Sequence, residues 1–177
     1  MAEIIRNDAV VADGWQILRL SAEAPLAPDS LPGGLIVVPF AFWMQHADAL
    51  ARRGDAGVWL AGNEEPAPLA PWLPVLKLVA VDFPKFTDGR GYSIAYLLRS
   101  RLGYRGELRA IGDVLADQLF YMRRVGFDSF AVRADKDIHH ALAALKPFSD
   151  VYQGSWDNPV PAFRRHHRSG PGPRGGA

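Results

Sequence analysis

The chain has 177 residues, of which 49% are hydrophobic and 22% are charged, an ordinary composition for one globular domain with its own core. The formal net charge is +1, and four arginines lie after residue 163 in a stretch without acidic residues, so the rest of the chain is net negative. This charge distribution argues against nucleic acid or a membrane surface as a partner. Cysteine is absent, which excludes a thiolate nucleophile, a disulfide framework and a cysteine-ligated iron–sulfur cluster.

The first residues are not expected to form an export signal. Residues 1–8 are polar and contain no long apolar run, and no apolar run in the chain approaches the ~20 residues that span a bilayer. Together with the absence of cysteine, this pattern predicts a cytoplasmic protein.

The first part of the chain predicts strands, a helix and a loop. In order these are short strands over 3–20, a loop over 21–34, a strand over 35–38, a helix over 41–53 and a strand over 57–60. Asp13-Gly14 is the clearest turn signal, and Gly54 suits the residue after a helix. The proline-rich segment 61–74 is either a surface loop or a linker between two subdomains. We favour the loop, because the unit before it is too small to fold alone.

From Lys77 onward strands alternate regularly with helices. The expected elements are strands over 78–82, 107–111, 129–132 and 151–152, and helices that end at Gly103, Gly126 and Pro147. This alternation predicts a single α/β domain over 1–163 with a mostly parallel sheet. The chain is short for a complete barrel of ~250 residues, so the sheet is expected to be partial and barrel-like, or open and doubly wound. The basic segment 164–177 is predicted to be a disordered tail.

Three charged residues stand directly at or after the ends of predicted strands: Asp82, Asp113 and Arg133. In parallel α/β sheets the carboxyl ends of the strands meet at one edge, and that edge carries the ligand site. We therefore expect these three side chains to lie near one another. Asp82 and Asp113 are candidate general acids or bases, although Asp113 is also the expected N-cap of the following helix, and Asp82 could instead bind loop backbone.

Residues 88–93 open a helix directly after a strand and a loop. Gly89 and Gly91 would let backbone N–H groups converge there, and a helix N-terminus favours an anion. Lys85 and Arg90 would add positive charge, so the segment predicts an oxyanion, phosphate or carboxylate site. The alternative is a flexible turn.

In that alternative Asp88 caps the helix. The pattern is not a dinucleotide fingerprint, because Ile94 stands where the third glycine would be. Arg109 lies inside a strand, where it could pair with Glu107, Asp82 or Asp113, or reach a ligand. Arg133 is the arginine best placed to meet an anion.

Other chemistry is not expected. Ser93 departs from the G-x-S-x-G pattern and has no histidine obviously placed to activate it. His139 and His140 are adjacent and would point in different directions on a helix, so no metal site is predicted. No cofactor is predicted.

A long motif resembles a known family. The segment DFPKFTDGRGYS over 82–93 carries most of the likeness, with further matches at 98–99, 106–115, 117–119 and 126–130. These segments resemble the hallmark of an uncharacterised bacterial family, domain of unknown function nine-three-four. Members are often labelled as oxidoreductases probably involved in sulfite reduction, a label that reflects a gene setting beside assimilatory sulfite reductase.

The resemblance implies a role in sulfur assimilation. A chain without cysteine or a dinucleotide fingerprint is a poor electron carrier, so we expect an accessory protein that binds sulfite reductase, its electron donor or a small anion. The alternative is a stand-alone enzyme acting on a small anionic metabolite, with a pocket lined by the residues named above: Asp82, Lys85, Arg90, Asp113 and Arg133. A plain scaffold without a pocket is the third possibility.

Overall fold

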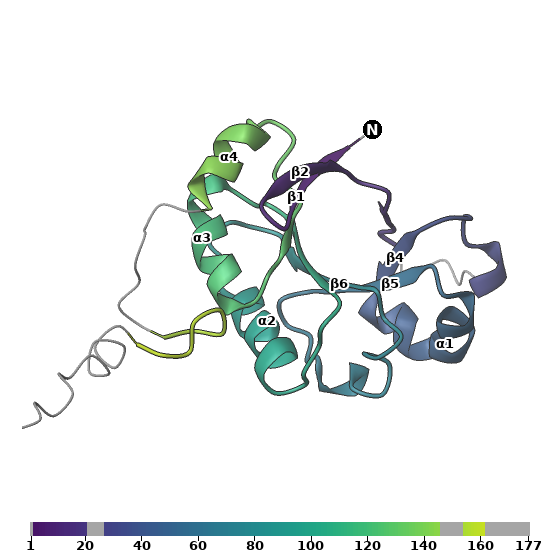
Figure 1. Cartoon of the computed structure of the whole chain (residues 1–177). Helices are drawn as coiled ribbons and strands as arrows, with labels where there is room; N and C mark the ends of the chain where they lie inside the picture. Colours follow the sequence, from purple (N-terminus) through teal and green to yellow (C-terminus); the bar gives the residue numbers. More distant parts are fainter. Residues whose placement is uncertain (1, 21–26, 146–153, 162–177) are drawn as a thin grey trace, which may run out of the picture.

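The computed structural model describes residues 2–20, 27–145 and 154–161, and within these it has one sheet of eight strands and four α-helices. The strands are β1 (Glu3–Arg6), β2 (Ala9–Ala12), β3 (Gln16–Ile17), β4 (Ile36–Pro39), β5 (Ala56–Leu60), β6 (Leu78–Phe83), β7 (Glu107–Gly112) and β8 (Ser129–Phe130). The helices are α1 (Phe40–Arg53), α2 (Arg90–Ser100), α3 (Ala116–Val125) and α4 (Ile138–Ala144). All four helices lie on the outer side of the curved sheet (Figure 1).

The strands run in the order β2-β1-β8-β7-β6-β5-β4-β3. From β3 to β8 each strand pairs in parallel with the next strand of the chain, and β1 pairs antiparallel with both β2 and β8. The predicted α/β class with a mostly parallel sheet and short N-terminal strands is therefore confirmed. Of the two geometries left open by the sequence, the structure has the curled, barrel-like one.

The two edge strands of the sheet belong to one stretch of chain. Only Asp13, Gly14 and Trp15 separate β2 from β3, so the segment that starts on one edge continues onto the other. The turn predicted at Asp13-Gly14 is wrong, because residues 13–15 contain no turn and simply join the two edges. The tight turn between β1 and β2 is made by Asn7 and Asp8, whose φ angles are positive at 50° and 64°.

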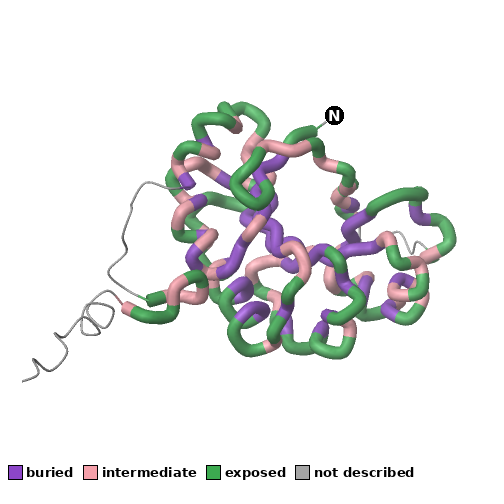
Figure 2. Tube along the Cα trace, viewed as in Figure 1, coloured by how far each residue is buried: buried purple, intermediate pink, exposed green. Residues whose placement is uncertain are grey.

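Buried residues follow the central strands of the sheet (Figure 2), and the sheet has an apolar cluster on each side. Its outer face packs on the helices, where Trp43 and Leu50 of α1 and Ile94 and Leu98 of α2 are buried in the main core. The inner face carries a smaller cluster, formed by Val37, Leu78, Ala80 and Ile111 with Trp15, Ile17, Trp59 and Ala131 around it. Because β6 is buried on both faces, its sequence is a nearly continuous apolar run.

A buried arginine joins the inner face to residues 13–19, which include β3 and which we call the closing segment. Arg109 is 1% exposed, and its guanidinium donates to Glu107 Oε1 (2.6 Å) and to Asp13 Oδ1 (2.9 Å). The sequence left several partners open for Arg109, of which Glu107 is one. Asp13 was not foreseen, because it lies about a hundred residues away along the chain.

Several predicted boundaries are corrected by the structure. Helix α3 begins after Leu115, so the prediction that Asp113 is its N-cap is wrong. Val114 and Leu115 separate Asp113 from the helix start, and Gly112 just before Asp113 has a left-handed φ of +93°. The Gly54 prediction is confirmed, with a left-handed φ of 73° after α1. The strand predicted at 151–152 and the tail over 164–177 lie outside the described residues.

Two further findings concern the described part of the chain. None of its helices is long and apolar enough to cross a membrane. Nor do its side chains form a group of three or more potential metal ligands.

A substitution at Gly91 tests how closely α2 packs on the sheet. A methyl group there would lie 2.5 Å from Cζ of Phe83 and 3.0 Å from Cγ1 of Val81, so Gly91→Ala must push α2 outward. We expect urea unfolding to show a loss of about 1–3 kcal/mol. Gly33→Ala, whose added methyl meets nothing within 4 Å, is the control and should stay within about 0.5 kcal/mol. Equal stabilities of the two variants would contradict this packing.

Candidate ligand pocket at the strand carboxyl ends

An open pocket of about 480 Å³ lies at the carboxyl ends of the parallel strands. Its lining comes from the segment after β3, from the last residues of β6 and β7, and from the residues that follow β6, β7 and β8. The lining residues are Arg19, Asp82, Phe83, Pro84, Gly112, Asp113 and Arg133. The expectation that Asp82, Asp113 and Arg133 meet in space is therefore confirmed, although they are up to 51 positions apart in sequence. We call this site the strand-end pocket.

Strand register explains the convergence. Phe83 pairs with Gly112, so β6 and β7 end side by side and Asp82 and Asp113 leave them at the same edge. The chain after β8 is held against the same edge, because the backbone N–H of Arg133 donates to the carbonyl of Val114 (3.1 Å). Neighbouring parallel strands therefore bring charged side chains together even though these side chains lie far apart in sequence.

Arg19 completes the pocket and was missed by the sequence analysis. Its Nη1 and Nη2 donate to the two oxygens of Asp82, at 3.0 and 2.7 Å, and this hydrogen-bonded pairing raises the pKa of Arg19. Asp82 is only 8% exposed, whereas more than half of the Arg19 side chain is accessible. The guanidinium also lies 5.2 Å from the ring centre of Trp59, a cation–π distance. Arg19 is therefore oriented from two sides.

The second arginine is held in a similar way. Nη1 of Arg133 donates to Asp113 Oδ1 (2.8 Å), while Nε and Nη2 donate to Asp135 (2.6 and 3.0 Å). Hydrogen bonds to Asp135 and Asp113 raise the pKa of Arg133, and the bond from Arg133 lowers the pKa of Asp135 to about 2. Both guanidinium groups of the strand-end pocket therefore keep their charge at any physiological pH.

Each arginine retains donors that the described part of the chain does not use. A guanidinium has five N–H donors. Among the described residues, Arg19 spends one N–H of each Nη on Asp82, and Arg133 spends one N–H of each of its three nitrogens on the two aspartates. Three donors of Arg19 and two of Arg133 are left for a ligand or solvent.

Two neighbours fix the carboxylates. A methyl group at Gly112 would lie 2.7 Å from Asp82 Oδ1, so only glycine fits beside the buried carboxylate. Asp113 uses its second oxygen to accept the backbone N–H of Phe86 (3.0 Å), and Gln118 Nε2 donates to the carbonyl of Phe86 (2.7 Å). Asp113 thus connects the pocket to the loop before α2, where Phe86 is 54% exposed.

The predicted anion loop at the start of α2 lies elsewhere. Arg90 pairs with Asp88 (2.6 Å) and lines a separate open pocket with residues 62–66, and Asp88 accepts the backbone N–H of Arg90 (3.2 Å). The bonds from Arg90 lower the pKa of Asp88 to about 2. The prediction that Asp88 is the helix cap is wrong by one residue, because the N-cap is Gly89, although Asp88 still accepts the first helical N–H.

The other predicted anion-binding residues also lie outside the strand-end pocket. Lys85 is exposed on the loop and Gly89 sits at the N-cap of α2. Gly91 is buried against Phe83, and Arg109 is enclosed by the inner face. Binding roles for these residues stay predictions, and Arg133 is the one predicted anion-binding residue that lines the strand-end pocket.

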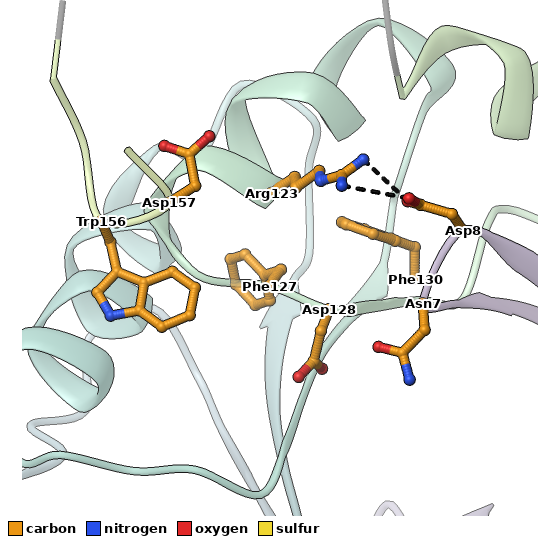
Figure 3. Close-up of a pocket in the computed structure, with 8 residues that line it drawn as sticks. All are labelled: Asn7, Asp8, Arg123, Phe127, Asp128, Phe130, Trp156 and Asp157. Atoms are coloured by element: carbon orange, nitrogen blue, oxygen red, sulfur yellow. Dashed lines mark hydrogen bonds and ion pairs between the residues drawn. The ribbon is translucent and has the colours of Figure 1, made fainter. Parts of the chain in front are cut away.

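A second cavity, of about 370 Å³, lies on the amino-terminal side of β8 (Figure 3). The rings of Phe127, Phe130 and Trp156 line it, and the ion pair between Arg123 and Asp8 (2.8 Å) stands at its edge.

Another arginine, Arg99, contacts two of the residues that line the second cavity. Arg99 is buried, donates to Asp128 Oδ2 (2.7 Å), and lies 5.3 Å from the ring centre of Trp156. Burial raises the pKa of Asp128, although the Arg99 guanidinium lowers it in part. Since Arg99 also binds the carbonyls of Gly126 and Gly106, its contacts hold the chain around β8 together.

Comparison with known proteins agrees with the resemblance found in the sequence. A family described as bacterial protein of unknown function, DUF934, matches residues 57–163, which is more than half of the chain. The chain belongs to the DUF934 family. No curated protein matches it significantly. The DUF934 match includes Asp82, Asp113 and Arg133, whereas Arg19 lies before it.

Asp113 should control the loop that carries Phe86. Asp113→Ala removes the acceptor of the Phe86 N–H, so we expect hydrogen exchange at that amide to become about tenfold faster or more. Asp135→Ala is the matched control, because it also removes a carboxylate from Arg133 but does not touch the loop. Equal exchange rates at Phe86 in both variants would show that Asp113 does not hold the loop.

Proposed function

We propose that this DUF934 protein is an accessory protein of assimilatory sulfite reduction that binds a small anion in the strand-end pocket. The observation that carries the proposal is the meeting of two guanidinium groups, from Arg19 and Arg133, at the carboxyl edge of a parallel sheet. Each guanidinium is oriented by a carboxylate and keeps unused donors.

The chemistry of the two arginines suits oxyanions. A guanidinium presents N–H groups in a planar fork that matches two oxygens of a sulfate, sulfite, phosphate or carboxylate group. Hydrogen bonds to charged groups contribute about 1.5–3 kcal/mol each, so an anion bridging both arginines would bind usefully. The pocket is open, which allows exchange with solvent.

The partner we propose is sulfite reductase or its electron donor. The label of the family motivates this choice, and the exposed Phe86 beside the pocket supports it, since its backbone is fixed at both its N–H and its carbonyl. Exposed aromatic side chains are enriched at protein interfaces, and a fixed backbone lowers the cost of presenting one.

Anion binding should depend on the two pocket arginines. Arg19→Ala and Arg133→Ala should each weaken binding of sulfite and of sulfate, measured by isothermal titration calorimetry, by about tenfold or more. Arg90→Ala removes an exposed arginine outside the strand-end pocket and should leave the affinity unchanged. Loss of binding in Arg90→Ala but not in the other two variants would move the site to the α2 loop.

The proposed process has a genetic test. A deletion strain should fail to grow on sulfate, and sulfide but not sulfite should restore growth, because the defect would lie at the reduction step. Normal growth of the deletion strain on sulfate would contradict the role in sulfite reduction.

A stand-alone enzyme acting on a small anionic metabolite is the second candidate. The buried carboxylate of Asp82, at the floor of a ligand-sized pocket, favours it as a general acid or base. This candidate requires the purified chain to convert an added anion by itself, and Asp82→Asn to abolish the conversion, whereas the accessory protein would convert nothing alone.

A further inference from the structure

We infer that the ligand of the strand-end pocket is a zwitterion, a small organic molecule with one oxyanion group and one ammonium group. The inference rests on the proposed binding function of the pocket and names its ligand class. It follows from the charge balance, the unused hydrogen-bonding positions and the size of the pocket.

The charges that line the pocket cancel. Arg19 and Arg133 contribute two positive charges, and Asp82 and Asp113 contribute two negative charges. A simple inorganic anion is attracted by the arginines and repelled by the carboxylates a few ångströms away, so much of its Coulomb energy is lost. A zwitterion placed across the pocket is attracted at both ends.

Donors and acceptors are both available. The five unused N–H donors of the two arginines suit the oxyanion group. For the ammonium group the acceptor is Asp113, whose two oxygens each accept one bond, from Arg133 and from the Phe86 N–H. Each carboxylate oxygen has two lone pairs, so both oxygens of Asp113 can accept another bond. Asp113 is also more accessible than Asp82, with side-chain exposures of 20% and 9%.

The pocket is too large for an inorganic oxyanion alone. Its volume of about 480 Å³ lies within the ~300–1,000 Å³ that is usual for organic ligands. A water molecule has ~30 Å³ of liquid volume, so a tetrahedral ion of five heavy atoms would leave most of this space to solvent. A molecule with a short carbon chain between its two charges fits better.

The test compares molecules that differ only in the ammonium group. Taurine and ethanesulfonate form one pair, and alanine and propionate form the other, with affinities measured by calorimetry at neutral pH. In at least one pair we expect the ammonium compound to bind about tenfold tighter. Asp113→Asn should abolish this preference, so that the two members of the pair bind this variant with affinities within about threefold of each other. Arg133→Ala should weaken both members of the pair.

The possible outcomes distinguish the inference of a zwitterionic ligand from the proposed anion-binding function. If sulfate, sulfite, ethanesulfonate or propionate binds as tightly as the ammonium compounds, the zwitterion is wrong and the anion-binding function stands. If the preference survives in Asp113→Asn, the assignment of the ammonium site to Asp113 is wrong. If none of these compounds binds the wild-type chain, both the inference and the proposed function fall.

Discussion

The closing segment that connects the two edges of the curled sheet is held across the curl by two ion pairs. Asp13 binds the buried Arg109 at one end, and Arg19 binds the buried Asp82 at the other. Between them Trp15 lies over Gly57, which has no side chain to oppose it, and Trp59 Nε1 donates to the carbonyl of Leu18 (3.0 Å). The strand-end pocket depends on this segment, because Arg19 forms one of its walls.

Much of the parallel half of the fold could be predicted, because each buried strand is an apolar run followed by an amphipathic helix. The carboxyl ends of parallel strands meet at one edge whatever the order of the strands. This rule was enough to place Asp82, Asp113 and Arg133 together. Arg19 could not be found in this way. It follows a strand of two residues, and its partner Asp82 is 63 positions away, so the pairing exists only once the sheet has curled.

The glycine-rich segment at α2 shows that a local motif does not determine the contacts of its residues. Gly91 looked like part of an anion-binding turn, but its missing side chain makes room for the ring of Phe83. Arg90 looked free to bind a ligand, but it pairs with Asp88 two residues earlier. A glycine permits both close packing and backbone exposure, and the sequence does not distinguish these uses. Asp113 was misjudged similarly, because the turn at Gly112 points it toward Phe86 instead of α3.

The central claim is that two arginines from distant parts of the chain form one anion site at the carboxyl edge of the sheet. The most direct measurement is a crystal structure of the protein grown or soaked with sulfite. The account predicts the anion within hydrogen-bond distance of both Arg19 and Arg133. A sulfite bound instead at Lys85 and Arg90, with the strand-end pocket holding only water, would contradict it.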